Sequence, residues 1–196
     1  MTAARTLRTP DDLIAAGLAP PERKAELEQV AARYAVAITP LMAELSQDAD
    51  GPIARQFLPA AAELVQAPEE RADPIGDDAY SPVEGVVHRY PDRVLLKANH
   101  ACAVYCRFCF RREMVGPDGV RPLSGAQLDA AMAYIAAHPE IWEVILSGGD
   151  PLVLSPRRLG ALVRRLDAIP HVRVIRVHTR VPAADPALVS DELVAA

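Results

Sequence analysis

The sequence has few cysteines, few lysines and no long apolar run: its 196 residues include three cysteines, and only Lys24 and Lys97 are lysines. A helix needs about 18 or more apolar residues in a row to cross a bilayer, so no transmembrane helix is predicted. The net charge is −5 without any basic block, which argues against nucleic-acid binding. Residues 1–10 have no apolar segment of the secretory type. We therefore expect a cytoplasmic protein with neither a membrane nor a nucleic-acid partner.

Residues 1–66 are predicted to be helical and to form a packing or oligomerisation layer. Between residues 21 and 39, apolar side chains recur at the spacing of one helix face. This set is Leu27, Val30, Ala31, Tyr34 and Ile38. Two further helices are expected over residues 40–47 and 52–65. Frequent proline and glycine make residues 67–92 an extended linker segment.

An alternation of strands and helices begins at residue 93. The expected strands are 94–98, 142–146 and 172–178, and the expected helices are 124–138, 155–169 and a last one from 186. Ser124 and Gln127 have capping-box spacing, and Ser155 before Pro156 is typical of a helix start. This order implies βαβ units and a parallel sheet. A complete barrel has eight such units, so we expect an α/β fold in which residues 93–196 are the first half of a (βα) barrel, truncated or expressed as a fragment.

The three cysteines follow the first of these strands, with the spacing Cys102-x3-Cys106-x2-Cys109. A tight odd cluster is a poor disulfide framework and indicates metal binding or catalysis. Three thiolates on one loop can hold three corners of an iron–sulfur cube and leave the fourth iron open. The alternatives are a zinc site with His100 as fourth ligand, which would make the protein a Cys3His interaction module, and three unrelated buried cysteines.

The stretch Cys102–Arg112 resembles the radical S-adenosylmethionine (SAM) signature, in the form found in the lysine 2,3-aminomutase family. The resemblance covers about residues 70–190. It includes Ser81-Pro82-Val83, His88-Arg89-Tyr90-Pro91-Asp92-Arg93, Ser147-Gly148-Gly149-Asp150-Pro151-Leu152 and His178-Thr179-Arg180-Val181-Pro182. It implies an isomerase with a radical SAM barrel that interconverts L-lysine and β-lysine. The sister enzyme that modifies elongation factor P is the alternative within the family, and the segment Glu113–Gly116 favours the free-lysine type.

The resemblance also implies the cofactors and their residues. Cys102, Cys106 and Cys109 would ligate a 4Fe–4S cluster, and SAM would chelate the open iron and be cleaved to a 5′-deoxyadenosyl radical that abstracts hydrogen from the substrate. The residues expected to face SAM are Gly148, Gly149, Asp150, His178 and Thr179. Glycine lets a backbone approach closely, and a carboxylate can accept hydrogen bonds from an ammonium group. A Gly-Gly turn with a capping Asp, followed by an ordinary strand end, is the structural alternative.

Three arginines match family residues that bind acidic groups. Arg111 is expected to pair with the substrate carboxylate, which the guanidinium fork suits, and Arg89 and Arg93 with the phosphate of pyridoxal 5′-phosphate (PLP). A solvated Arg111, and local salt bridges for the other two, are the structural alternatives. Neither Lys24 nor Lys97 matches the family's PLP lysine, so we expect this chain alone to be inactive. The family also implies a reductase or flavodoxin-type electron donor and a homo-oligomer in the full-length form.

Overall fold

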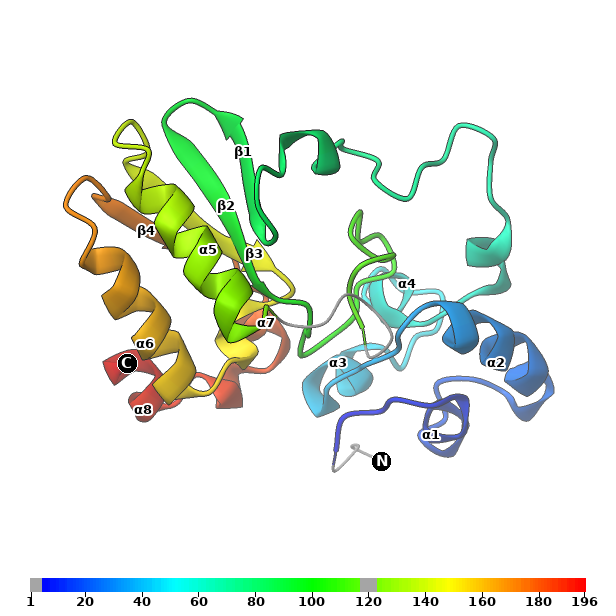
Figure 1. Cartoon of the computed structure of the whole chain (residues 1–196). Helices are drawn as coiled ribbons and strands as arrows, with labels where there is room; N and C mark the ends of the chain where they lie inside the picture. Colours follow the sequence, from blue (N-terminus) through cyan, green and yellow to red (C-terminus); the bar gives the residue numbers. More distant parts are fainter. Residues whose placement is uncertain (1–4, 117–122) are drawn as a thin grey trace.

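The computed structural model describes residues 5–116 and 123–196 and has a four-stranded sheet (Figure 1). Its strands, in spatial order, are β1 (Val86–Tyr90), β2 (Arg93–Asn99), β3 (Glu143–Gly148) and β4 (Val174–Val177). β2, β3 and β4 are parallel, with Leu95 opposite Ile145 and Ile145 opposite Arg176, and β1 is antiparallel to β2. The prediction of an α/β fold is confirmed, and so is the parallel pairing of the three predicted strands.

Two long helices, α5 (Gly125–Ala136) and α6 (Pro156–Asp167), cover one face of the sheet (Figure 1). Alternate strand residues point toward them, because successive side chains of a strand lie on opposite faces. The resulting core includes Val94, Leu96, Val144, Leu146, Ile135, Leu159, Leu162 and Leu166. The capping prediction is confirmed, since the Ser124 hydroxyl accepts from the Gln127 N–H and Ser155 accepts from the Arg158 N–H.

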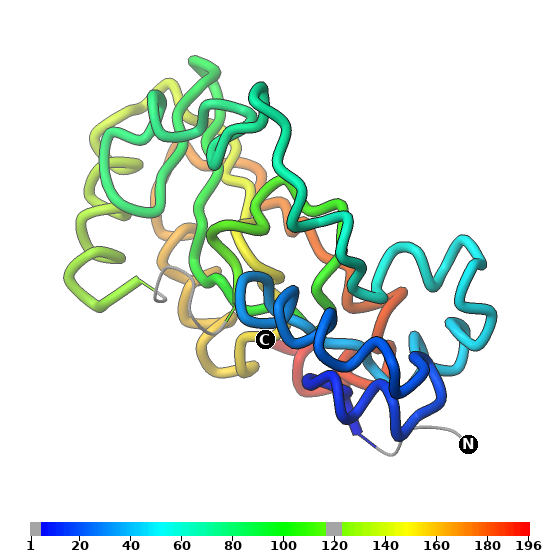
Figure 2. The backbone as a smooth tube through the Cα atoms, turned by 90° about the vertical axis from the view of Figure 1, so that its right-hand side faces the viewer, coloured from blue at the N-terminus to red at the C-terminus, as the bar shows by residue number. Residues whose placement is uncertain are grey.

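The N-terminal region consists of short helices beside the carboxyl ends of β2 and β3 (Figure 1), and in the second view its blue and cyan segments lie on one side of the molecule (Figure 2). They are α1 (Pro10–Ala15), η1 (Pro21–Arg23), α2 (Lys24–Arg33), α3 (Pro40–Leu45), α4 (Ala54–Phe57) and η2 (Ala61–Leu64), where η marks a 3₁₀ helix. The helix expected up to residue 39 ends at Arg33. The reason is a backbone pairing of Ile38 with Leu7, whose two N–H···O distances are 2.8 and 3.0 Å.

The segment expected as a linker contains strand β1 and the 3₁₀ helix η3 (Asp78–Tyr80). Glycine and proline on both sides of β1 conceal a five-residue strand that a tight turn at Pro91-Asp92 pairs with β2. The helix expected from residue 186 is divided into η5 (Pro186–Leu188) and α8 (Asp191–Ala195), which Ser190 caps. Two more short helices, η4 (Pro151–Val153) and α7 (Val181–Ala184), follow β3 and β4. Among the described residues, no helix has the length and apolarity to cross a membrane.

The central strand β3 carries the core, so Leu146→Ala should destabilise the protein strongly. Leu146 is fully buried between the sheet and the two long helices, and its truncation should cost about 2–5 kcal/mol through lost burial and a residual cavity. The same change at Leu45, whose exposed fraction is 51%, should alter stability by only about 0.5 kcal/mol. Urea unfolding of the two variants measures the difference, and equal losses would contradict this description of the core.

Candidate functional site

The loop that follows β2, residues 101–116, carries all three cysteines, and they line one cavity of about 320 Å³. The ends of β3 and β4 form the opposite wall. Residues of the site predicted from sequence that line this cavity are Cys102, Cys106, Cys109, Arg111, Gly149, Asp150, His178 and Thr179. The carboxyl ends of neighbouring parallel strands meet at one edge of a sheet, which is where open α/β folds and barrels bind ligands.

Asp150 joins the end of β3 to the start of the cysteine loop through its backbone. Its N–H donates to the carbonyl oxygen of Ala101 at 2.8 Å, and its own carbonyl accepts from the Asn99 side-chain amide at 2.9 Å. The neighbouring Gly149 N–H donates to the Asn99 carbonyl at 2.8 Å. These three bonds fix the first residues of the loop against the strand.

The Asp150 carboxylate joins the same point to the end of β4. Oδ1 accepts from the Thr179 hydroxyl at 2.7 Å and from the Leu152 N–H at 3.0 Å. Oδ2 accepts from the N–H groups of Arg180 and Val181 at 2.7 and 3.2 Å. A carboxylate offers about four acceptor sites, so donors within the chain occupy all of them. In this structure Asp150 is the capping residue of η4 and also a clamp on the turn after β4.

The two glycines before Asp150 are required by close packing against the end of β2 and the start of the cysteine loop. Gly148 has φ +99°, a region that side chains rarely adopt, and a Cβ there would lie 2.6 Å from the Asn99 carbonyl oxygen. A Cβ on Gly149 would lie 2.4 Å from the Ala101 carbonyl oxygen. Both glycines therefore allow the end of β3 to approach residues 99–101 closely, and this packing role does not depend on any ligand in the cavity.

Burial controls the state of the thiols. Burial, together with the negative charge of the nearby Asp150 carboxylate, raises the pKa of Cys102 to about 12. Burial also raises the pKa of Cys106. Both groups are therefore protonated at neutral pH until a metal displaces the protons. Three half-buried sulfur donors that open into one cavity fit an iron–sulfur group, because soft thiolates are its usual ligands.

The alternative of a Cys3His zinc site finds no support in the geometry. His100 is buried, burial lowers its pKa, and neither ring nitrogen has a hydrogen-bond partner among the described residues. The residues around the cavity include the cysteines but not His100. In residues 5–116 and 123–196, no three His, Cys, Asp or Glu side chains converge on a point that could hold one metal ion. A cubane differs in this respect, since each of its sulfur ligands binds a separate iron.

Arg111 is buried at the cavity wall and is not a solvated surface residue. Its Nη2 donates to the Asp77 carboxylate at 3.0 Å, and its Nη1 is 3.4 Å from the Ser147 hydroxyl. Its Nε has no partner in the described part of the chain. A buried donor without an acceptor is costly, so Arg111 is suited to receive a further anionic group.

Arg89 and Arg93 lie apart from the cysteines and line a second cavity of about 110 Å³, together with Asp77. Arg89 donates to the carbonyl of Ile75 at 2.6 Å and approaches Asp77 at 3.4 Å. Arg93 makes two hydrogen bonds of 2.9 Å to Asp92. Both arginines thus make the local salt bridges that were the structural alternative for them.

Sequence reasoning missed two residues of this region. Asp77 contacts both Arg111 and Arg89 and is buried. Arg180 lines the main cavity and stacks over the Phe108 ring at 5.0 Å. The cluster of acidic residues in the proline- and glycine-rich segment 73–78 was the available signal for Asp77, and the position of Arg180 directly after Thr179 was the signal for Arg180.

Comparison with known proteins agrees with an iron–sulfur centre at this site. A family model described as "4Fe-4S single cluster domain" matches residues 92–178, which include the cysteine loop and the ends of all three parallel strands. The chain is thus similar to proteins that hold a single iron–sulfur cluster on such a domain.

Sequence relatives make the comparison more specific. The chain is 39% identical to the L-lysine 2,3-aminomutase of Acetoanaerobium sticklandii over 89% of this chain and 42% of that relative. It is 40% identical to the enzyme of that name from Clostridium subterminale, over 81% of this chain and 38% of the relative, and 41% identical to that from Escherichia coli, over 74% and 42%. The resemblance to the radical SAM lysine 2,3-aminomutase family is confirmed, and the chain spans less than half the length of these relatives.

The packing of β3 on the cysteine loop predicts that Gly149→Ala is destabilising. The added methyl group would meet backbone and not a flexible side chain, so we expect a loss of about 1–3 kcal/mol, as for other overpacked sites. Gly125→Ala is the matched control, because a Cβ at this first residue of α5 has nothing within 4 Å. It should stabilise the protein by up to about 1 kcal/mol. Thermal unfolding compares the two, and a neutral Gly149→Ala would show that the close approach is not needed.

Proposed function

We propose that this chain carries the cluster-binding and SAM-binding part of a radical SAM aminomutase that interconverts L-lysine and β-lysine. The observation that carries the proposal is the single cavity shared by the three cysteines, Arg111 and the ends of β3 and β4. The names of the relatives support the choice of reaction and substrate. In this proposal residues 1–66 are a helical region and 93–196 the first half of a radical SAM barrel, and the segment 67–92 links the two and also contributes β1 to the sheet.

Cys102, Cys106 and Cys109 are proposed to hold a 4Fe–4S cluster with one iron open to the cavity. When bound, the cluster supplies the electron that cleaves SAM. The loop contributes three sulfur donors and a largely apolar wall, in which Val104 and Tyr105 are buried.

The opposite wall is proposed to bind SAM through Gly148, Gly149, Asp150, His178 and Thr179. Gly149, Asp150, His178 and Thr179 line the cavity, and Gly148 precedes them at the end of β3. Because the Asp150 carboxylate already has four donors within the chain, its contribution is to hold the Thr179–Val181 turn in place against the cofactor.

Arg111 is proposed to bind the substrate carboxylate. Asp77 holds one terminal nitrogen of the guanidinium, and the unpartnered Nε remains as a donor at the cavity wall. A charge-assisted hydrogen bond in a buried site is strong and directional. Because Arg111 lines the same cavity as the three cysteines, it would hold the amino acid beside the cluster.

Arg89 and Arg93 are proposed to meet the phosphate of PLP at the second cavity, which both residues line. Lys24 pairs with Asp11 at the surface and Lys97 is buried in β2, and neither matches the family's PLP lysine. We therefore expect no lysine migration by the 196-residue chain alone. A cytoplasmic location, a reductase or flavodoxin-type electron donor and a homo-oligomer in the full-length form belong to the same proposal.

The cluster assignment predicts that Cys106→Ser abolishes stable iron binding. A hydroxyl is a hard, weakly acidic ligand and replaces a thiolate poorly, while the core of the sheet is far from the change. Anaerobic reconstitution followed by iron and sulfide analysis, with 5′-deoxyadenosine release from SAM as a second readout, tests this. A Cys106→Ser variant with full iron and full SAM cleavage would overturn the proposed function.

The substrate assignment predicts that Arg111→Lys, in the complete enzyme, weakens lysine binding by about 1.5–3 kcal/mol, the range of a hydrogen bond to a charged group. The ammonium group of a lysine side chain at position 111 cannot reproduce the forked geometry of the arginine guanidinium. Arg112→Lys is the control, since Arg112 pairs with Glu70 at 3.4 Å and stacks over the Tyr34 ring at 4.6 Å but does not line the cavity of the cysteines. Lysine affinity and iron content are measured together. Unchanged affinity in Arg111→Lys would contradict the assignment, and lost iron would indicate that Arg111 shapes the cysteine loop instead.

A further inference from the structure

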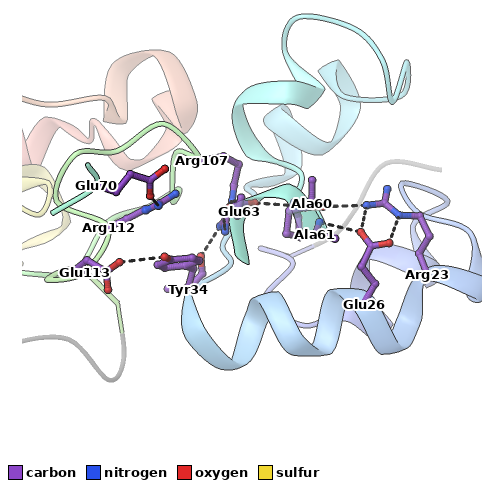
Figure 3. A network of polar contacts seen from close by, with 12 residues as sticks. Arg23, Glu26, Tyr34, Ala60, Ala61, Glu63, Glu70, Arg107, Arg112 and Glu113 are labelled. Carbon is purple, nitrogen blue, oxygen red and sulfur yellow. Dashed lines mark hydrogen bonds and ion pairs between the residues drawn. The ribbon is translucent and has the colours of Figure 1, made fainter. Parts of the chain in front are cut away.

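A buried ion pair joins the cysteine loop to the N-terminal helical region (Figure 3). Arg107 lies between the second and third cysteines, and its guanidinium donates to the Glu63 carboxylate through Nη2 at 2.6 Å and through Nε at 3.0 and 3.1 Å. The exposed fractions of the two side chains are 8% and 12%. This is the bidentate geometry in which arginine and carboxylate interact most strongly.

Both partners are fixed by further hydrogen bonds. The Arg107 Nη1 donates to the Ala35 carbonyl at 2.8 Å, and its backbone N–H donates to the Gln56 carbonyl at 2.8 Å. The Glu63 carboxylate also accepts from the Ala60 N–H at 2.9 Å, within its own 3₁₀ helix. Arg107 is therefore held by three separate parts of the N-terminal region, which sets the direction of the loop between Cys106 and Cys109.

The neighbouring charge pairs of the same network are weaker. Arg112 and Glu70 approach to 3.4 Å, with exposed fractions of 29% and 43% (Figure 3). Arg33 and Glu113 approach to 3.5 Å. Exposed pairs of this kind contribute little, whereas loss of one partner from a buried pair leaves an uncompensated charge. Of these three charge pairs, Arg107–Glu63 is thus the one that contributes most to holding the loop.

We propose that Glu63 is a positioning residue for the iron–sulfur cluster, acting through Arg107 on Cys106 and Cys109. This inference rests on the proposed function, in which these cysteines ligate the cluster. It gives the N-terminal helical region a role in the cofactor site, beyond that of a packing layer.

The pair has an electrostatic consequence in addition to its structural one. Arg107 places a positive charge next to two cluster ligands, and Glu63 cancels it in a site shielded from water. Reduction of a cluster by one electron from an external donor adds a negative charge, and net charge nearby is one of the determinants of its potential. Without the Glu63 charge, the reduced form is stabilised and the potential becomes more positive.

Glu63→Gln tests the inference, with Glu70→Gln as matched control, because both remove one negative charge from a partner of a loop arginine without a change of size. Each chain is reconstituted anaerobically, titrated with dithionite under EPR detection, and then exposed to an iron chelator. In Glu63→Gln we expect a more positive midpoint, with the reduced-to-oxidised ratio at fixed potential raised about threefold or more, and faster iron loss. Glu70→Gln should match the wild type in both.

A Glu63→Gln variant with the wild-type potential and the wild-type rate of iron loss would overturn the inference. If this variant does not fold, Arg107→Lys supplies the same test, because it keeps the charge but not the fork. It should lose iron faster at a nearly unchanged potential, and wild-type iron loss would again overturn the inference. A wild-type chain that takes up no iron under these conditions would instead refute the proposed function, so the two failures are distinguishable.

Discussion

The carboxylate of Asp150 is the constraint on which the arrangement of the site depends. Parallel strands bring their carboxyl ends to one edge, but that alone does not fix the loops that follow them. Asp150 binds the start of the cysteine loop through its backbone and the turn after β4 through its carboxylate. Because Asp150 donates its N–H to Ala101 on one side and accepts from Thr179, Arg180 and Val181 on the other, it links the start of the cysteine loop to the Thr179–Val181 turn across the cavity.

The cysteine loop has little regular structure, so contacts from outside must determine its conformation. On one side the end of β3 approaches so closely that only glycine fits at position 148, against β2, and at position 149, against Ala101 at the start of the loop. On the other side the N-terminal region packs against it: the Tyr105 N–H donates to the Ala37 carbonyl at 3.1 Å, and Arg107 is bound by Glu63. The small cluster of Ala37, Tyr105 and Val115, with Cys102 and Cys109 against it, completes this contact. The loop is thus clamped between two regions that are distant in sequence.

The sequence was sufficient for features that local patterns encode. The alternation of apolar strands with helices predicted the parallel sheet, and the capping residues Ser124 and Ser155 predicted the starts of two of its helices. The position of the three cysteines directly after the first strand placed the cysteine loop at the strand ends. Features that depend on tertiary contacts were not predictable in this way. The helix after Pro21 ends early because Ile38 pairs with Leu7, and β1 is hidden among glycine and proline. The acidic cluster around Asp77 marks that segment but not its partner, and Glu63 has no distinguishing local pattern. Both carboxylates pair with distant arginines, Asp77 with Arg111 and Glu63 with Arg107, which lie 34 and 44 positions further along the chain.

In the proposed function, the cysteine loop holds a cluster with one iron open to SAM. The most direct measurement is the EPR spectrum of the anaerobically reconstituted and reduced wild-type chain, recorded with and without SAM. Direct coordination of SAM to the open iron should change the spectrum of the reduced cluster. A cluster signal that is identical with and without SAM, or a chain that yields no cluster signal at all, would contradict the account.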